Sequence, residues 1–110
     1  MNQENYNNID DFNTYLNSRH IVLVYFSADV CNICKILKPK VTDLVKNNHP
    51  EVELIYLNTE KNLNLCGQLL IFSIPTIIIF FKGREYVKFS RNVSLKQLDD
   101  SLHRLKEIIG

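Results

Sequence analysis

Residues 21–34 read IVLVYFSADVCNIC, and this stretch decides the fold. It opens with a run of β-branched, aliphatic and aromatic residues over 21–26, as expected for a central strand that is buried on both faces. Two cysteines three positions apart, Cys31 and Cys34, follow this run and begin a segment whose apolar residues recur at helical spacing. A C-x-x-C pair in a chain that alternates strands and helices is typical of a redox-active dithiol.

The size and composition indicate one ordinary globular domain. The chain has 110 residues, of which 45% are hydrophobic and 23% charged. We predict a single domain over residues 1–110, in which residues 1–7 form either a flexible arm or a short edge strand. A net charge of +1 does not indicate the excess of basic residues that binds nucleic acid or an anionic membrane, so we expect neither as a partner.

Three further features bear on the compartment. The first five residues, MNQEN, are polar and lack the basic start and apolar stretch of a signal peptide. The longest apolar run, residues 77–81, is too short to span a bilayer. Three cysteines are an odd number and too few for a disulfide framework, which suits a reducing compartment. We therefore expect a cytoplasmic protein, and we expect it to be a monomer.

Periodicity and turn signals predict eight elements. They are a helix that Asn8 caps and that ends near 17–18, a strand over 21–26, a helix from the cysteines to the stop at 47–50, a strand over 52–57, a short helix over 63–70, strands over 76–81 and 85–90, and a helix that begins after Ser94. Pro39 should kink the second helix because it cannot donate to the carbonyl of Lys35. Gly83 supplies the positive φ that a hairpin turn needs. Ser94 and Gln97 form a capping box.

This order predicts an α/β fold. A strand–helix–strand opening implies two parallel strands with a right-handed crossover, and the later hairpin adds an antiparallel edge. The sheet is therefore mixed, with helices on both faces.

These residues resemble the thioredoxin family over about residues 8–105, nearly the whole chain. The motifs that carry the resemblance are Phe26-Ser27-Ala28-x-x-Cys31-x-x-Cys34-Lys35, Pro39, Ile74-Pro75-Thr76 and Lys82-Gly83. The resemblance implies the thioredoxin fold, a central mixed sheet sandwiched by helices. It also implies a thiol–disulfide oxidoreductase whose redox-active group is the Cys31–Cys34 pair itself, without a further cofactor.

The position of the dithiol explains its chemistry. At the start of a helix, unpaired backbone N–H groups and the helix dipole stabilise the thiolate of Cys31, which is the nucleophilic form. Cys34 lies three residues on, on the same helix face, within reach of a mixed disulfide at Cys31. We predict that Cys31 attacks a protein disulfide and that Cys34 resolves the mixed disulfide.

The resemblance also implies a substrate-binding surface. It implies that Pro75 is cis and lies beside the dithiol, and that the backbone of Ile74 pairs with the substrate as an added strand. Thr76 and Val30 complete the predicted substrate-binding residues. The implied partners are disulfide-containing proteins and a dithiol electron donor such as a thioredoxin reductase.

The sequence departs from the family's pattern around the dithiol. Asn32 and Ile33 replace the usual Gly-Pro between the cysteines, and the chain has no tryptophan. Tyr25 stands where the family commonly has a buried aspartate, and Tyr56 where it has the lysine that partners it. Arg91 replaces a glycine that keeps the partner-docking surface flat. The family's redox potential and its proton relay therefore do not transfer directly to this chain.

Other polar residues have more than one interpretation. Asp29, just before the dithiol, is either a solvated loop carboxylate or a substitute for the missing proton relay, a role that water could also take. Cys66 lies on an apolar helix stripe and is either a core residue or a regulatory thiol near the site. We expect the three histidines at the surface, and their spacing matches no zinc motif, so we predict no metal.

Two other functions stay open. One is a glutathione-dependent enzyme of the glutaredoxin kind, although the residues typical of that group before the cis-proline are missing. The other is a non-catalytic, redox-sensitive interaction module, which the lost relay and Arg91 favour. A metal or iron–sulfur site that bridges two chains is a more distant third.

Overall fold

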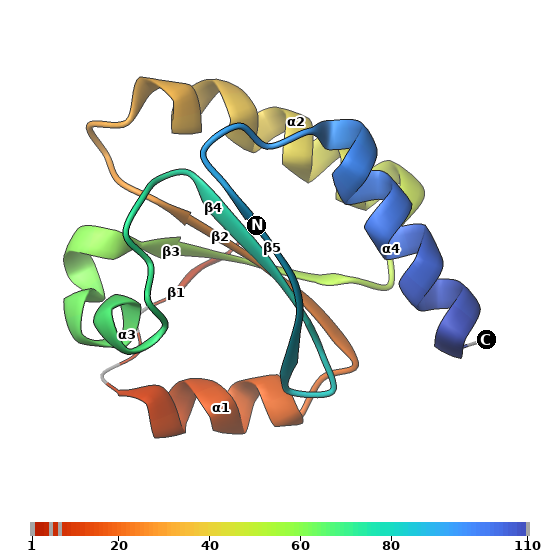
Figure 1. Ribbon diagram of the computed structural model, residues 1–110, viewed down its shortest axis with the longest axis horizontal. Helices are drawn as coiled ribbons and strands as arrows, with labels where there is room; N and C mark the ends of the chain where they lie inside the picture. The colour runs from red at the N-terminus through yellow and green to blue at the C-terminus, as the bar shows by residue number, and fades with distance from the viewer. Residues whose placement is uncertain (1, 5, 7, 110) are drawn as a thin grey trace.

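A five-stranded mixed sheet forms the centre of the protein, and the structure is a computed structural model that describes residues 2–4, 6 and 8–109. In chain order the elements are β1 (Asn2–Glu4), α1 (Ile9–Asn17), β2 (Ile21–Ser27), α2 (Asn32–Asn48), β3 (Glu53–Asn58), the 3₁₀ helix η1 (Thr59–Lys61), α3 (Leu63–Gln68), β4 (Thr76–Phe81), β5 (Arg84–Ser90) and α4 (Leu95–Ile109). The strand order is β1-β3-β2-β4-β5. Helices α2 and α4 cover one face of the sheet, and α1 and α3 lie on the other (Figure 1). The predicted α/β sandwich is confirmed.

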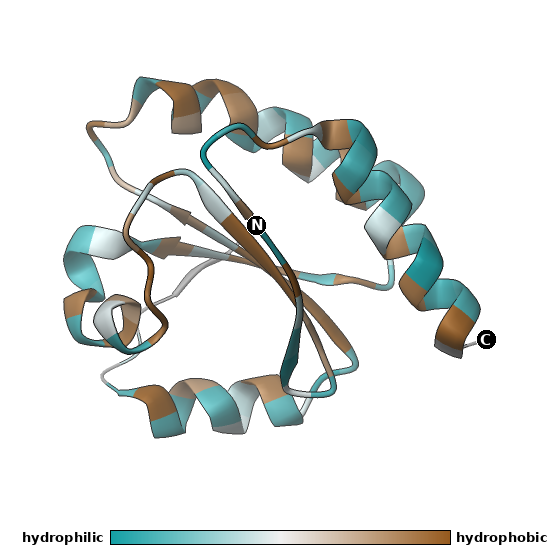
Figure 2. Cartoon of the chain, viewed as in Figure 1, coloured by the Kyte–Doolittle hydropathy of each residue, from teal (hydrophilic) through white to brown (hydrophobic). Residues whose placement is uncertain are grey.

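The middle strand is β2, and every one of its residues is buried. It pairs in parallel with β3 and antiparallel with β4. Because helices cover both faces, both sets of alternating side chains must be apolar. Figure 2 shows this as a hydrophobic centre of the sheet between helices that mix hydrophobic and hydrophilic residues.

Alternate residues of β2 point into two separate cores. Ile21, Leu23 and Tyr25 face α2 and α4 in one core, together with Cys34, Val41, Val45, Leu98, Leu102 and Leu105. Val22, Val24 and Phe26 face α1 and α3 in the other, together with Phe12, Leu16, Leu65 and Cys66. Burial of side chains of this size stabilises a fold by about 1.5–3 kcal/mol each, before the entropy of ordering them is subtracted. The first of these cores, which includes Cys34, packs the start of α2 against β2.

The two sheet edges differ. At one edge β1 pairs in parallel with β3, so residues 2–4 form the short edge strand that was one of the two expectations for the N-terminus. The expectation for residues 1, 5 and 7 lies outside the described residues. At the other edge β5 pairs antiparallel with β4 through a turn in which Lys82 and Gly83 have φ of 50° and 83°. Gly83 supplies the left-handed conformation that this turn requires.

Side-chain caps begin the first and last helices as predicted. The side chain of Asn8 accepts a hydrogen bond from the backbone N–H of Asp11 at 2.9 Å. The hydroxyl of Ser94 accepts one from the backbone N–H of Gln97 at 3.2 Å. Each cap satisfies a donor that the helix itself leaves unpaired. Helix α2 continues on both sides of Pro39.

Some expectations about burial are wrong. The apolar residues at helical spacing after the cysteines, and those of the short helix predicted over 63–70, were expected to face the core, yet Ile33, Leu63 and Leu70 are exposed. His49 was expected at the surface and is completely buried. The helical spacing identifies a face of a helix, but it does not show where neighbouring segments stop covering that face. Among the described residues, no helix has the length and apolar character needed to cross a membrane.

Candidate functional site

Cys31 and Cys34 lie at the junction between β2 and α2. Cys31 is the residue that caps α2, and Cys34 lies in the first turn of that helix. The two form a disulfide, with their Cα atoms 5.2 Å apart. Cys31 is partly exposed whereas Cys34 is completely buried. Of the two sulfur atoms, only that of Cys31 is therefore open to a partner molecule.

The start of α2 places hydrogen-bond donors around the Cys31 sulfur. Its Sγ accepts a hydrogen bond from the backbone N–H of Cys34 at 3.2 Å. This N–H belongs to the first turn of the helix, where the helix dipole is also positive. Both effects favour a thiolate over a thiol at this position. The local geometry is thus suited to a nucleophilic Cys31.

Tyr25 lies beneath the dithiol, on β2. Its hydroxyl donates a hydrogen bond to the backbone carbonyl of Cys34 at 2.8 Å. Burial, and then the neighbouring Tyr56, raise the pKa of Tyr25 far above its ordinary value. The hydroxyl therefore keeps its proton and acts as a fixed donor to the first turn of α2. Tyr25 is thus a core aromatic residue with a tethered hydroxyl.

Tyr56 forms the second layer under the site. Its ring stacks on that of Tyr25, with centroids 5.2 Å apart, and its hydroxyl is hydrogen-bonded to that of Ser27. The ammonium group of Lys38, on α2, lies 3.9 Å from the centre of the Tyr56 ring. Lys38 thus helps to cover this aromatic pair.

The segment before β4 lies at the same end of the sheet as the dithiol. Thr76 is the register partner of Phe26, near the end of the strand that leads to Cys31. The peptide bond between Ile74 and Pro75 is cis. Ile74 and Cys31 pack against the same hydrophobic core. The predicted substrate-binding segment thus leads into β4, which pairs with β2, the strand that precedes the dithiol.

Exposed apolar side chains occur on both segments. Val30 is 82% exposed and Phe72 is 85% exposed, and Ile33 and Ile36 also project from the surface. Phe72 and Ile74 line one hollow. Sequence reasoning missed Phe72 and Ile36. The signal was present, because Ile36 falls outside the buried stripe of α2 and Phe72 stands in a loop.

A second hollow lies beside the exposed face of α2. Its lining residues are Ile33, Ile36, Leu37, Lys40, Arg91, Asn92 and Val93. Arg91 has a φ of 62°, a left-handed conformation that a glycine adopts without strain. Its backbone N–H donates to the carbonyl of Pro75 at 3.0 Å. The hollow therefore has apolar walls and two cationic side chains. The hydrogen bond from Arg91 joins one of its walls to the segment that contains Pro75.

The two remaining candidates from the sequence occupy different surroundings. Asp29 is exposed, and its carboxylate accepts a hydrogen bond from the side-chain amide of Asn58 at 3.1 Å. Cys66 is a free cysteine in the core between the sheet and α3, and burial raises the pKa of its thiol. Cys66 is thus a core residue, although one side of it lines the same hollow as Ile74.

A partly exposed cysteine caps the helix that follows the central strand, and it is disulfide-bonded to a buried cysteine one helical turn later. This arrangement is that of a thiol–disulfide oxidoreductase. The chain belongs to the thioredoxin family, whose model matches residues 4–104.

Three proteins illustrate the similarity. The chain is 23% identical over 91 residues to a thioredoxin-like protein, YdfQ, of Bacillus subtilis, covering 83% of this chain and 80% of that protein. It is 38% identical over 69 residues to a thioredoxin of Synechocystis, covering 63% of this chain and 64% of that protein. The structure of thioredoxin 1 from Thermosipho africanus matches with a TM-score of 0.73 and 31% identity, over 80% of this chain and 97% of that one. The thioredoxin fold is confirmed.

Proposed function

We propose that the protein reduces disulfides in protein substrates, with Cys31 as the nucleophile and Cys34 as the resolving residue. The observation that carries the proposal is the difference in burial between the two sulfur atoms of one disulfide. The sulfur of the partly exposed Cys31 also accepts a hydrogen bond from the backbone N–H of Cys34, in the first turn of α2. No cofactor is required, because the dithiol itself carries the two electrons.

The reaction consists of two exchanges. The Cys31 thiolate attacks one sulfur of the substrate disulfide, forms a mixed disulfide and releases the other substrate sulfur as a thiolate. The sulfur of Cys34, as a thiolate, then attacks the Cys31 sulfur. The Cys31–Cys34 disulfide forms and the second substrate sulfur leaves. Two electrons have passed to the substrate, which takes up two protons, and a dithiol donor such as a thioredoxin reductase must reduce the protein again.

The substrate surface is formed by Val30, Ile74 and Pro75, with Phe72 in the hollow that Ile74 also lines. Thr76 was predicted to belong to this surface, but it is buried and its hydroxyl donates to the carbonyl of Ser73 at 2.7 Å. Ile74 offers its backbone beside Pro75 to an extended substrate segment. Two cations, Lys40 and Arg91, lie in the neighbouring hollow and favour acidic residues in the partner. The proton that Cys34 loses is taken up by water or by Asp29, since the tyrosine hydroxyls beneath the site already have partners.

An odd number of cysteines suits a reducing compartment, and we propose that the protein acts in the cytoplasm, as a single-domain monomer. A mixed-disulfide trap tests the function. The Cys34→Ser variant should accumulate disulfide-linked partners at Cys31, whereas the Cys31→Ser variant should accumulate none. Failure of the Cys34→Ser variant to capture any disulfide protein would contradict the proposal.

The second candidate function is a redox-sensitive docking module without turnover. Tyr25 and Tyr56 in place of a charged proton relay, together with the projecting Arg91, favour it. Such a module would show a Cys31–Cys34 disulfide that responds to redox conditions, but it would not accelerate reduction of a protein disulfide by dithiothreitol. Measured turnover therefore separates the two functions.

A further inference from the structure

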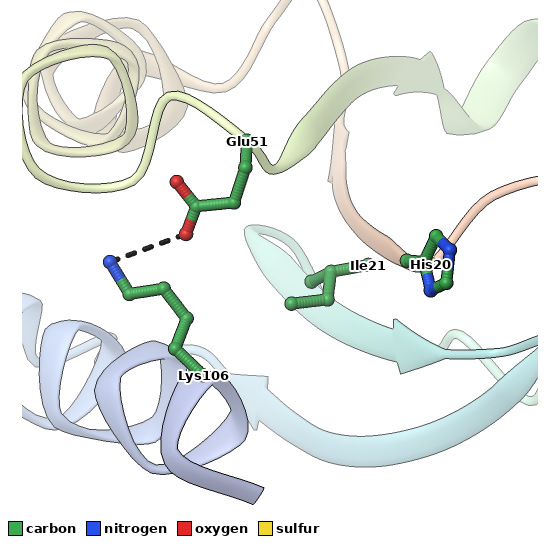
Figure 3. A pocket seen from close by; sticks show the side chains of 4 residues that line it. All are labelled: His20, Ile21, Glu51 and Lys106. Carbon is green, nitrogen blue, oxygen red and sulfur yellow. Dashed lines mark ion pairs between the residues drawn. The ribbon is translucent and has the colours of Figure 1, made fainter. Parts of the chain in front are cut away.

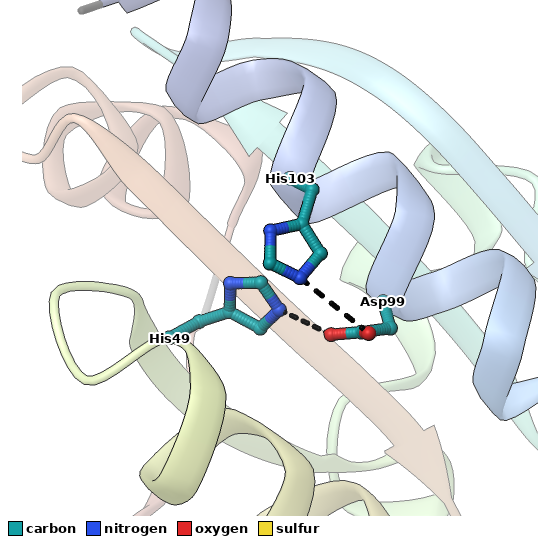
Figure 4. A group of neighbouring side chains, drawn as sticks. All are labelled: His49, Asp99 and His103. Atoms are coloured by element: carbon teal, nitrogen blue, oxygen red, sulfur yellow. Dashed lines mark hydrogen bonds and ion pairs between the residues drawn. The ribbon is translucent and has the colours of Figure 1, made fainter.

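Two histidines and an aspartate meet at the end of α2 that is remote from the dithiol. His49 directly follows α2, and Asp99 and His103 lie one turn apart on α4 (Figure 4). The Nε2 atom of His49 is 2.6 Å from Oδ1 of Asp99, and Nε2 of His103 is 3.6 Å from Oδ2 of the same carboxylate. One ligand atom from each of the three residues lies within 4.8 Å of the others.

The cluster is closed on the protein side and open on the solvent side. The His49 side chain is fully buried, the Asp99 side chain is 26% exposed and the His103 side chain is 53% exposed. Among the described residues, the Nδ1 of His49 is the buried side-chain polar atom without a hydrogen-bond partner. Buried polar atoms of folded proteins nearly always have a partner. The other ring nitrogen, Nε2, faces the Asp99 carboxylate, so the buried imidazole is held with one nitrogen toward the cluster.

We propose that His49, Asp99 and His103 bind a divalent transition-metal ion, of which Zn²⁺ is the natural probe. Two imidazole nitrogens and one carboxylate oxygen are a donor set that such ions take, with water in the open fourth position. Bonds of about 2.0–2.1 Å in a tetrahedron place ligand atoms about 3.3 Å apart. The two separations between Asp99 and the histidines lie on either side of this value, and His103 is exposed enough to turn toward the ion.

The surrounding charges permit a cation here. The ammonium group of Lys106, on the same helix as Asp99, donates to the backbone carbonyl of Asn48 at 3.0 Å and pairs with Glu51 at 3.2 Å (Figure 3). Its charge is therefore balanced by Glu51 and not by Asp99. On α4 the next carboxylate, Asp100, pairs with Lys96 at 2.9 Å and stays outside the cluster.

The unpartnered nitrogen of His49 sets an upper limit on the affinity. In the metal-free protein the Nε2 proton of His49 is donated to Asp99. Coordination through Nε2 moves this proton to Nδ1, where no acceptor lies among the described residues. A buried N–H without an acceptor weakens binding by about ten- to a hundredfold. We therefore expect a moderate, reversible site that links α2 to α4, and not a site that the fold needs in order to form.

The site is independent of the proposed function. Helix α2 has 17 residues and is about 25 Å long, so its far end lies well away from the Cys31 sulfur. A metal test must nevertheless use the oxidised protein, because a reduced dithiol is itself a zinc ligand. The disulfide removes Cys31 and Cys34 from competition, and the double variant Cys31→Ser, Cys34→Ser serves as a second background.

The experiment is calorimetric titration of the oxidised full chain with ZnCl₂, repeated for His103→Gln and for His20→Gln. His20 is exposed and stands outside the cluster, so its replacement removes a histidine without touching the site. We expect one ion per wild-type chain. Affinity should fall at least about tenfold in His103→Gln, since even residues that only support metal ligands cost this much when altered. It should be unchanged in His20→Gln.

The ¹⁵N chemical shifts of the imidazole rings report whether the ion binds at the nitrogen atoms of His49 and His103. On addition of Zn²⁺ the ring nitrogens of His49 and His103 should shift, while those of His20 should not. Absence of zinc binding by the wild type would overturn the proposal. So would a His103→Gln variant that binds as tightly as His20→Gln, or a shift confined to His20.

Discussion

The two ends of α2 differ in what surrounds them. At its start, Cys31 is partly exposed and Val30 and Ile33 project outward. At its end, the fully buried His49 is hydrogen-bonded to Asp99 of α4. One end presents apolar surface beside a disulfide, and the other ties two helices together with polar contacts. A single helix can therefore carry a reactive group at one end because contacts at its other end hold it in place.

The largest expected effect concerns the reactivity of the cysteines. In the reduced protein, iodoacetamide should alkylate Cys31 at least about 100-fold faster than Cys66 at neutral pH. Cys66 is buried, and burial raises the pKa of its thiol, so its thiolate forms only at higher pH than that of an exposed thiol. Site-resolved mass spectrometry over a pH series measures this. Equal rates for the two residues would contradict the contrast between an exposed, activated thiol and a core thiol.

The next effect concerns stability at the far end of α2. His49→Ala should lower the free energy of unfolding by about 2–3 kcal/mol, because it leaves a cavity and removes the hydrogen bond to Asp99. Urea unfolding with a chelator present measures the change, with His20→Ala as the exposed control. Disulfide reduction by the folded variant should be retained. A variant as stable as His20→Ala would show that this end does not hold the helix.

A smaller effect is expected directly under the dithiol. Tyr25→Phe should lower the free energy of unfolding by about 1 kcal/mol, since it removes the hydrogen bond to the Cys34 carbonyl without opening a cavity. Tyr86→Phe, on the exposed edge strand β5, is the matched control and should change little. No loss of stability in Tyr25→Phe relative to that control would contradict the positioning role given to the hydroxyl.

The smallest effect on stability should come from the exposed surface. Phe72→Ser should change the free energy of unfolding by less than about 0.5 kcal/mol, because the side chain is 85% exposed. It should nevertheless raise the KM for a protein disulfide and leave that for a small soluble disulfide unchanged. Ile108→Ser, an equally simple loss of an exposed apolar side chain on α4, should alter neither KM. A Phe72→Ser variant that matched Ile108→Ser would remove Phe72 from the substrate surface.

The contrast between the ends of α2 also explains what the sequence could predict. The start of α2 is encoded locally, because the apolar run, the C-x-x-C spacing and the helix start are contiguous in residues 21–34. Caps such as Asn8 and Ser94 are local as well, and both form. Strands β2 to β5 were predicted to within a residue of their ends, because β-branched runs between turn residues are a short-range signal. For β1 the sequence left a flexible arm and an edge strand as alternatives.

What sequence reasoning missed depends on contacts between distant segments. His49 and His103 are 54 positions apart, and only the packing of α2 against α4 brings their rings to a centroid distance of 4.7 Å. Ile33 and Leu63 have the spacing of core residues, yet in the described part of the chain both side chains are exposed. A spacing rule contains no information on such long-range neighbours, so both the buried histidine and the exposed apolar surface emerge only from the tertiary structure.

The central claim is that Cys31 is the nucleophile of a disulfide reductase. The most direct test is the rate at which the protein accelerates reduction of a protein disulfide by dithiothreitol. Wild type and Cys66→Ser should accelerate the reaction equally, whereas Cys31→Ser should leave only the uncatalysed rate. A wild-type rate equal to the uncatalysed one, or full activity in Cys31→Ser, would contradict the claim.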